Sequence, residues 1–191
     1  MKKLSGGIIA LIVVGVILLI AVISGVSAYN GLVELEEGIK SKSSQIDNQL
    51  QRRADLIPNL VSTVKGYTTH ETEAIEAVTS ARAKLTGASD TEDRLEANDE
   101  LSTALSRLLV IVENYPELKA DTQFTALTDE LSGTESRIAT ARKDYNDAVE
   151  KYNRKIRTFP ANIFSGLFGF EKAEYFEADE GASKVPEVNF D

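Results

Sequence analysis

Two arginines in this sequence stand where the spacing of their neighbours predicts the interior of a helical bundle. Arg53 belongs to a series of residues seven apart that otherwise holds Leu or Ile, and Arg142 belongs to a similar series nearer the end of the chain. A guanidinium that is taken out of water needs a carboxylate partner, because an uncompensated buried charge is strongly destabilising. We therefore expect either ion pairs that fix the register of the helices or an anion site. The other candidates for this network are Arg52, Asp55, Pro58, Asn59, Glu71, Arg82, Glu113 and Glu135.

A second polar pattern repeats along the last long helical segment. The pairs Tyr145-Asn146 and Tyr152-Asn153 lie seven residues apart, which puts both Tyr on one stripe of a helix and both Asn on the adjacent stripe. We expect the Tyr rings in the core, with their hydroxyl groups bonded across the bundle. The alternative is a stripe that recognises another helix.

Aromatic residues gather near the end of the chain, since six of the seven Phe follow residue 158. The helical spacing of this segment predicts one apolar face that begins as a continuation of the last seven-residue series. It could cover an exposed seam of the bundle, contact a partner or a second copy of the chain, or lie in a membrane interface. The candidate contact residues are Phe159, Phe164, Phe168 and Phe170.

The composition excludes several classes of chemistry. The absence of Cys rules out disulfides and thiolate ligands, and a single His rules out a di-iron centre built from paired Glu-x-x-His motifs. That residue, His70, lies beside Glu71 and Glu73, but a lone His at a helix start is more typical of a surface position than of a metal site. The net charge of −9 argues against a nucleic acid partner. We expect no enzyme, no catalytic residue, no metal and no cofactor.

The chain opens with an uncharged run. Residues 4–33 carry no charge, and Ile8–Val26 is almost entirely β-branched or Leu. At about 1.5 Å per residue this stretch spans ~28 Å, close to the thickness of a bilayer core. We predict one retained transmembrane helix over 8–28. The alternative is a cleaved signal peptide, for which Val26-Ser27-Ala28 is an acceptable cleavage site. The basic residues on the two sides favour an exported domain only slightly.

After Tyr29 the apolar residues step by three and four without strand-like alternation, which predicts narrow apolar seams and near-parallel packing. The fold class is all-α, an N-terminal transmembrane helix followed by an antiparallel up-and-down bundle. We predict four bundle helices at about 30–66, 69–86, 92–114 and 118–158, or three helices if 30–86 is continuous. The expected organisation is a short segment 1–7, the span 8–28, the bundle 29–160 and a Phe-rich, then acidic, tail 161–191.

Breaks in the pattern indicate where helices end. Thr68 and Glu71 have the spacing of a capping box, so Gly66 is expected to close one helix and Thr68 to cap the next. Residues 86–91 form a loop with capping residues. Pro116 is expected to end a helix at the residue before it, and Pro58 to kink a helix or open a hydrogen bond.

These features resemble the LemA family, over nearly the whole chain and in order. The resemblance implies a bacterial, membrane-anchored, all-helical protein, and it brings no established activity or catalytic motif. It rests on Tyr29–Val33, Gln51–Val61, Val64–Tyr67, Glu71, Ala81-Arg82, Glu113–Ala120, Thr134–Ile138, Ala141-Arg142, Tyr145-Asn146, Tyr152-Asn153 and Phe159-Pro160.

We therefore expect a membrane-anchored scaffold or adaptor of the bacterial cell envelope that acts through protein contacts, with self-assembly left open. The alternatives are a sensory or ligand-binding bundle that signals through a partner, and a membrane-stress or lipid-contact protein that uses the aromatic tail.

Overall fold

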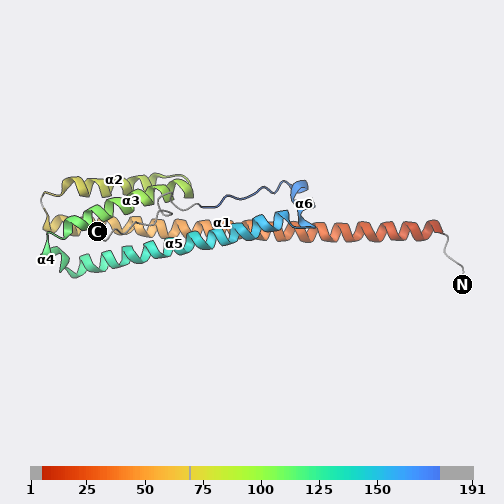
Figure 1. Ribbon diagram of the computed structural model, residues 1–191, viewed down its shortest axis with the longest axis horizontal. Helices are drawn as coiled ribbons and strands as arrows, with labels where there is room; N and C mark the ends of the chain where they lie inside the picture. Colours follow the sequence, from red (N-terminus) through yellow and green to blue (C-terminus); the bar gives the residue numbers. More distant parts are fainter. Residues whose placement is uncertain (1–5, 69, 177–191) are drawn as a thin grey trace, which may run out of the picture. The chain divides into compact units, whose positions relative to one another are not determined.

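The computed structural model describes residues 6–68 and 70–176, and all the regular structure in these residues is helical. The helices are α1 (Gly6–Tyr67), α2 (Thr72–Gly87), α3 (Thr91–Val112), α4 (Pro116–Lys119), α5 (Thr122–Arg157) and α6 (Ala161–Phe168) (Figure 1). The all-α prediction is confirmed. The tail beyond Phe176, which we expected to be acidic, lies outside the described residues.

The chain forms two compact units, and both α1 and α5 contribute to each. Of the described residues, the anchor unit comprises 6–40 together with Asn146–Tyr175. The bundle unit comprises the described residues of Ser41–Tyr145 together with Phe176.

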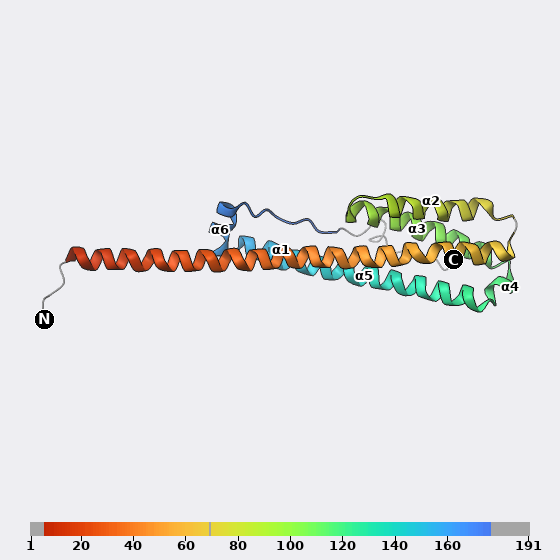
Figure 2. The same ribbon diagram turned by 180° about the vertical axis from the view of Figure 1, so that it is seen from behind.

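In the bundle unit, α1, α2, α3 and α5 run alternately up and down (Figures 1 and 2). Lys42 on α1 pairs with Asp144 on α5 at 3.0 Å, and the hydroxyl of Tyr67 at the end of α1 donates to Asp121 at 2.8 Å. Residue numbers rise along α1 as they fall along α5, so these two helices are antiparallel. The alternative of one continuous helix over 30–86 is wrong, because α1 ends at Tyr67.

The seven-residue spacing correctly predicts the core of the bundle unit. Ile46, Leu50, Ile57, Leu60 and Val64 of α1 are all buried. The facing side chains pack on them from the other three long helices, so each helix buries one narrow stripe, as the pattern indicates. These side chains include Val78, Leu85, Leu101, Leu108, Leu131 and Ile138.

Helix ends follow the sequence signals in part. Asp90 caps α3 as expected, with its carboxylate accepting from the amide of Asp93 at 2.9 Å. The prediction of a capping box between Thr68 and Glu71 is wrong. Glu71 makes no capping hydrogen bond, and Thr68 donates to the carbonyl of Val64 in α1.

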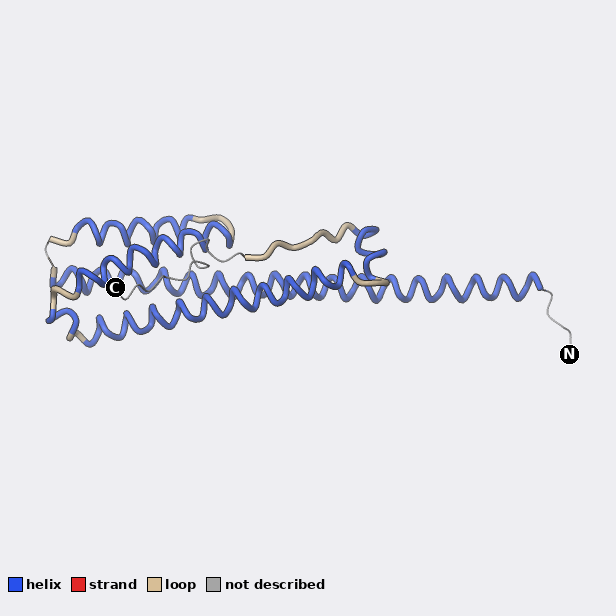
Figure 3. Tube along the Cα trace, viewed as in Figure 1, coloured by secondary structure: helices blue, strands red, loops and turns tan. Residues whose placement is uncertain are grey.

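The two prolines singled out by the sequence lie at the start of one helix and inside another. Pro116 follows the end of α3, as predicted, but it also begins the four-residue α4, so the last long helix starts at Thr122 and not near 118. Proline suits a first helical position, where no amide hydrogen is needed. Pro58 lies on the exposed side of α1, which remains helical from Gly6 to Tyr67 (Figure 3).

The anchor unit is built on the first part of α1. The uncharged run is long and apolar enough to cross a membrane, and its most apolar window has no residue buried inside the protein. The helix continues through residues 28–30 without a break, so the expected separation of a span from a second helix starting at 30 is absent there. The domain boundaries themselves stay a prediction.

The segment that follows α5 contacts this first part of α1. Helix α5 ends at Arg157, and α6 follows after a short turn. The expected continuation of the α5 seam to Phe159 is wrong, because that side chain lies beyond the helix and is 75% exposed.

Candidate functional site

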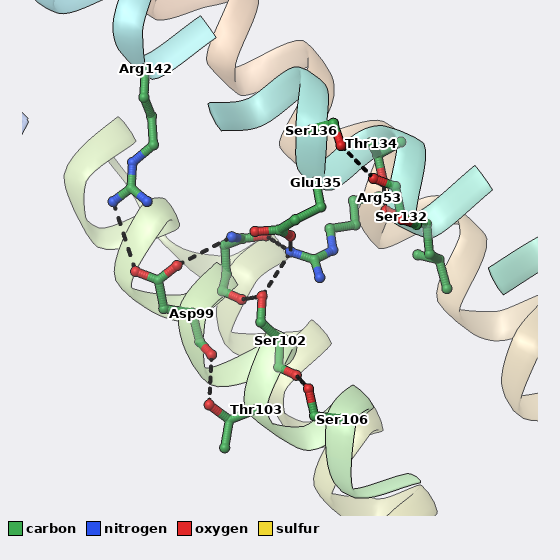
Figure 4. Close-up of polar contacts among 12 residues, drawn as sticks. Arg53, Asp99, Ser102, Thr103, Ser106, Ser132, Thr134, Glu135, Ser136 and Arg142 are labelled. Atoms are coloured by element: carbon green, nitrogen blue, oxygen red, sulfur yellow. Dashed lines mark hydrogen bonds and ion pairs between the residues drawn. The ribbon is translucent and has the colours of Figure 1, made fainter. Parts of the chain in front are cut away.

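The interior of the bundle unit contains one arginine that binds three helices together. Nη1 of Arg53, on α1, donates to Oδ1 of Asn98 at 2.5 Å and to Oγ of Ser102 at 3.0 Å, both on α3. The same nitrogen forms an ion pair with the carboxylate of Glu135 on α5 (Figure 4). The sequence predicted a carboxylate partner for a buried arginine and named Glu135 as one of four candidates, and Glu135 is the one that pairs with Arg53.

Burial dominates the electrostatics of this arginine. The side chain of Arg53 is only 5% exposed, whereas that of Glu135 is 47% exposed. Loss of hydration lowers the pKa of the Arg53 guanidinium, and the negative charges of Glu135 and Asp99 oppose that shift. An arginine remains protonated in proteins, so the pair stays ionic and fixes the three helices in register.

A second arginine extends the network along α5. Nη2 of Arg142 lies 3.8 Å from Oδ2 of Asp99, next to Asn98 on α3. Arg142 is half-buried, whereas Arg53 is buried. The predicted interior position of Arg142 is therefore confirmed only in part. Figure 4 shows Arg53 and Arg142 approaching α3 from α1 and α5, with Glu135 between α5 and Arg53.

A pocket of 360 Å³ opens beside the ion pair. Arg53, Glu135 and several Leu side chains line it together with five hydroxyl groups from α3 and α5. These hydroxyl groups belong to Ser102, Ser106, Thr128, Ser132 and Ser136.

The hydroxyl groups of this pocket are oriented by their own helices. Ser102 donates to the carbonyl of Asn98 at 3.0 Å, Ser106 to that of Ser102 at 2.8 Å, and Ser136 to that of Ser132 at 3.2 Å. Each oxygen retains lone pairs after donating its proton, so the pocket offers acceptors beside a buried cation. This arrangement could hold a small polar molecule that donates hydrogen bonds. Within 6–68 and 70–176, no group of three or more His, Asp or Glu is placed to hold a metal ion.

The other predicted network residues are not brought to Arg53. Arg52 pairs with Glu130 on α5 at 2.7 Å, and Nε of Arg82 on α2 donates to the carbonyl of Ala54 at 2.8 Å. These contacts tie α5 and α2 to α1 at separate places.

Of the remaining members of the predicted set, Glu71 is half-buried and accepts from the hydroxyl of Tyr115 at 2.6 Å, and the others lie at the surface of the bundle unit. Asp55 accepts from Gln51 within α1, and Glu113 pairs with Lys119. Pro58 and Asn59 are exposed on α1, where the carbonyl of Asn59 accepts from Thr63.

The two Tyr-Asn pairs contact the tail of the chain. Tyr152 donates its hydroxyl to the carbonyl of Glu171 at 2.8 Å, so the expected bond across the bundle is wrong for this residue. Asn153 binds the backbone of Ala173 twice, at 2.8 Å through its amide nitrogen and at 2.9 Å through its amide oxygen. The tail therefore folds back along α5.

The first pair differs from the second. The Tyr145 ring packs against Phe176 in the bundle unit, with centroids 4.3 Å apart. Asn146 is half-buried and belongs to the anchor unit.

The predicted tail residues divide between two faces. Phe168 and Phe170 meet Tyr29 of α1 edge to face, with centroid separations of 5.1 and 5.7 Å. Phe164 lies against Gly25 of α1, whereas Phe159 points to solvent. The prediction that these residues share a single apolar face is therefore wrong.

Sequence reasoning missed the residues of α3 that hold Arg53. Asn98 is fully buried, and it begins a series of apolar residues at helical spacing that includes Leu101 and Leu105. A polar residue at such an interior position needs a partner, which was the available signal. The pair of Arg94 with Asp47, at 3.0 Å between α3 and α1, was also missed.

Comparison with known proteins agrees with this architecture. The chain is 31% identical to Magnetosome protein MamQ 2 of Paramagnetospirillum magneticum over 90% of its own length and 73% of that protein. It is 26% identical to Protein LemA of Metamycoplasma hominis, over 79% of this chain and 69% of that protein. The family model that matches, described as the LemA family, covers residues 42–190. This membrane-associated helical protein belongs to the LemA family.

Proposed function

We propose that this protein is a membrane-anchored scaffold of the bacterial cell envelope that acts through protein contacts and catalyses no reaction. The observation that carries the proposal is the use of the interior polar groups. Arg53, Asn98 and Glu135 bind one another across three helices, which gives the bundle a fixed register. A bundle with a fixed register presents a constant outer surface, and a constant surface is what a scaffold needs.

The names of the relatives are consistent with such a role. Three of them, all MamQ proteins, are named for a subcellular structure, the magnetosome.

The exposed apolar side chains of α3 are the best candidate for the contact surface. Val110 is 71% exposed, and Leu109 beside it is 41% exposed. Leu109 also lines the pocket together with Leu105 and Leu131, so the apolar surface continues into a groove. Burial of such residues provides most of the free energy of protein association.

Site-specific cross-linking from the bundle in living cells tests this role. A photoreactive amino acid at Val110 is expected to yield a discrete adduct with a protein in living cells, and Leu109→Glu is expected to abolish it. The matched control places the same amino acid at Ser80, an exposed position on α2. Equal adducts from both positions, or adducts that survive Leu109→Glu, would contradict the proposal.

We also propose a single membrane span with the bundle outside the cytoplasm. Because the chain has no Cys, a single Ser80→Cys variant can be labelled without background. A maleimide that cannot cross membranes is expected to label it in intact cells. Labelling that requires broken cells would place the bundle in the cytoplasm.

The pocket favours a second candidate, a ligand-binding bundle. Its volume of 360 Å³ is within the range of small-molecule sites, and five hydroxyl groups surround a buried cation. Ser132→Leu should fill this space while leaving Arg53 paired. Mass spectrometry of small molecules released from purified wild-type protein and from Ser132→Leu tests it. A compound carried only by the wild type supports the candidate, and identical extracts argue against it.

A further inference from the structure

Helix α6 packs on α1 where the uncharged run approaches its end. A Cβ atom at Gly25 would lie 3.0 Å from Cε1 of Phe164, so the glycine leaves the space that this ring occupies. One turn further, the ring of Tyr29 meets those of Phe168 and Phe170. The uncharged run ends at Glu34, so α6 lies beside the last turns of the candidate span.

The side of α6 that does not contact α1 is apolar and exposed. Phe159, Ile163 and Leu167 are 75%, 58% and 74% exposed. Ile163 and Leu167 lie four residues apart on α6, a spacing that places them along one stripe of the helix, whereas Phe159 precedes α6 in the turn. Polar groups of this segment are used internally, since the Ser165 hydroxyl donates to the carbonyl of Ile156 at 2.9 Å.

This exposed stripe borders lipid-facing surface of the span. Val22, Ile23 and Val26 are all more than half exposed, and they belong to the same end of the span as Gly25. Because the exposed stripe adjoins the predicted lipid-facing surface of the span, we expect the lipids of the bilayer to cover both. Aromatic residues concentrate at this level, as they do where membrane proteins meet the headgroup region.

Basic residues precede α6 at the end of α5. Arg154, Lys155 and Arg157 are exposed in its last turn. Basic side chains beside an interfacial helix attract the phosphates of anionic lipids. Arg154 is paired with Glu150, so Lys155 and Arg157 are the two basic side chains of this turn that remain candidates for a lipid contact.

We propose that α6 is a second membrane contact, an interfacial helix that inserts Ile163 and Leu167 among the lipids, with Phe159 of the preceding turn beside them, while Lys155 and Arg157 bind headgroup phosphates. This inference rests on the membrane anchor of the proposed function and not on the scaffold role. It gives the chain a fixed depth in the bilayer, because α6 is bound to α1 through Gly25.

The absence of Trp allows a direct test, since one introduced Trp is the only indole in the chain. Full-length Leu167→Trp is reconstituted in vesicles whose lipids carry bromine either near the headgroup or near the chain end. We expect stronger quenching by the shallow bromine. Ile17→Trp, in the middle of the span, should be quenched best by the deep bromine. Ser80→Trp, on α2, is the matched unquenched control.

The outcomes separate this proposal from the one on which it rests. Quenching of Leu167→Trp no greater than that of Ser80→Trp, with Ile17→Trp quenched, would overturn the interfacial helix and leave the anchor intact. An unquenched Ile17→Trp would overturn both. Ile163→Trp repeats the test should Leu167→Trp fail to fold.

The headgroup contact is tested in mixed vesicles of phosphatidylcholine and phosphatidylglycerol. At equal mole fraction, brominated phosphatidylglycerol is expected to quench Leu167→Trp about twofold more than brominated phosphatidylcholine. When Lys155→Gln and Arg157→Gln are combined with Leu167→Trp, the two brominated lipids should quench the Trp equally. Equal quenching by the two lipids before these substitutions would overturn the phosphate contact.

Discussion

Arg53 and Glu135 form an ion pair whose two members differ in burial by a wide margin. The side chain of the arginine is 5% exposed, and that of the glutamate is 47% exposed. The Oε2 atom of Glu135 that faces Arg53 is buried, but the rest of its side chain is open to water, so removal of each partner has a different cost. In an ion pair at the surface, both members are exposed and the loss of either one costs little.

Glu135→Ala should therefore destabilise the bundle more than Arg53→Met. The first leaves a buried guanidinium without its carboxylate and should cost about 2–4 kcal/mol, because uncompensated buried charge is the larger penalty. The second leaves a carboxylate that water can solvate and should cost about 1–2 kcal/mol through Asn98. Urea denaturation followed by circular dichroism measures both. Arg154→Met, which breaks an exposed pair with Glu150, is the control and should change stability by less than about 0.5 kcal/mol. Equal costs for the two interior variants would contradict the asymmetry.

Tyr115 should make stability fall in alkali. Its hydroxyl donates to Glu71 at 2.6 Å, and this hydrogen bond, with burial and the negative charge of Glu71, raises the pKa of the Tyr115 hydroxyl above its ordinary value of 10.0. The protonated form is favoured in the folded state, so the contribution is complete below pH 10.0 and is lost as the pH rises through the folded-state pKa.

The comparison of wild type with Tyr115→Phe isolates this effect. The wild type should melt at a higher temperature near neutral pH, and the difference should shrink as the pH rises above 10.0. Differential scanning calorimetry across that range gives the two melting temperatures. A difference that stays constant with pH would show that the hydroxyl proton is not involved.

Substitution of Gly25 should detach α6 from α1. A β-branched side chain in Gly25→Ile cannot share the space of the Phe164 ring, whose nearest atom is 3.0 Å from a Cβ at that position. Gly15→Ile is the matched control in the same helix, because a Cβ there meets no atom within 4 Å. Limited proteolysis of the reconstituted protein near Phe168 should become several-fold faster in Gly25→Ile and remain unchanged in Gly15→Ile.

Asn153→Ala should release the tail from α5. The Asn153 side chain accepts from the amide of Ala173 and donates to the carbonyl of the same residue. Hydrogen exchange at the Ala173 amide is expected to accelerate about tenfold, since a hydrogen bond of this kind contributes about 1 kcal/mol and its loss also exposes the amide. Asn153→Asp keeps the acceptor and should retain part of the protection. Unchanged exchange in Asn153→Ala would mean that other contacts hold the tail.

The positions that the sequence predicted well are those set by local periodicity. Leu32, Ile46, Leu60 and Ile138 occupy seven-residue series, and all are buried. The need of Arg53 for a carboxylate partner followed from the cost of burying charge, but the choice of Glu135 among the candidates did not. Asn98 and Ser102 were not predicted as its other partners, because α1 and α3 are distant in sequence and their register depends on packing.

The tail shows where local pattern was insufficient. Spacing alone placed Phe159 and Phe164 on one apolar face, yet one is exposed and the other touches Gly25. The difference arises because α5 ends at Arg157 and the chain turns before α6 begins. A turn changes the direction of the helix axis, so positions on its two sides no longer share a face.

The sequence by itself determined the class of this protein: an uncharged first helix, an all-helical bundle and membership of the LemA family. These properties depend on composition, periodicity and ordered motifs, which are local features of the chain. Only the tertiary structure decided which carboxylate meets Arg53, that Tyr152 and Asn153 hold the tail, and that α6 returns to Gly25. These are contacts between distant segments, and they depend on how whole helices pack, turn and align.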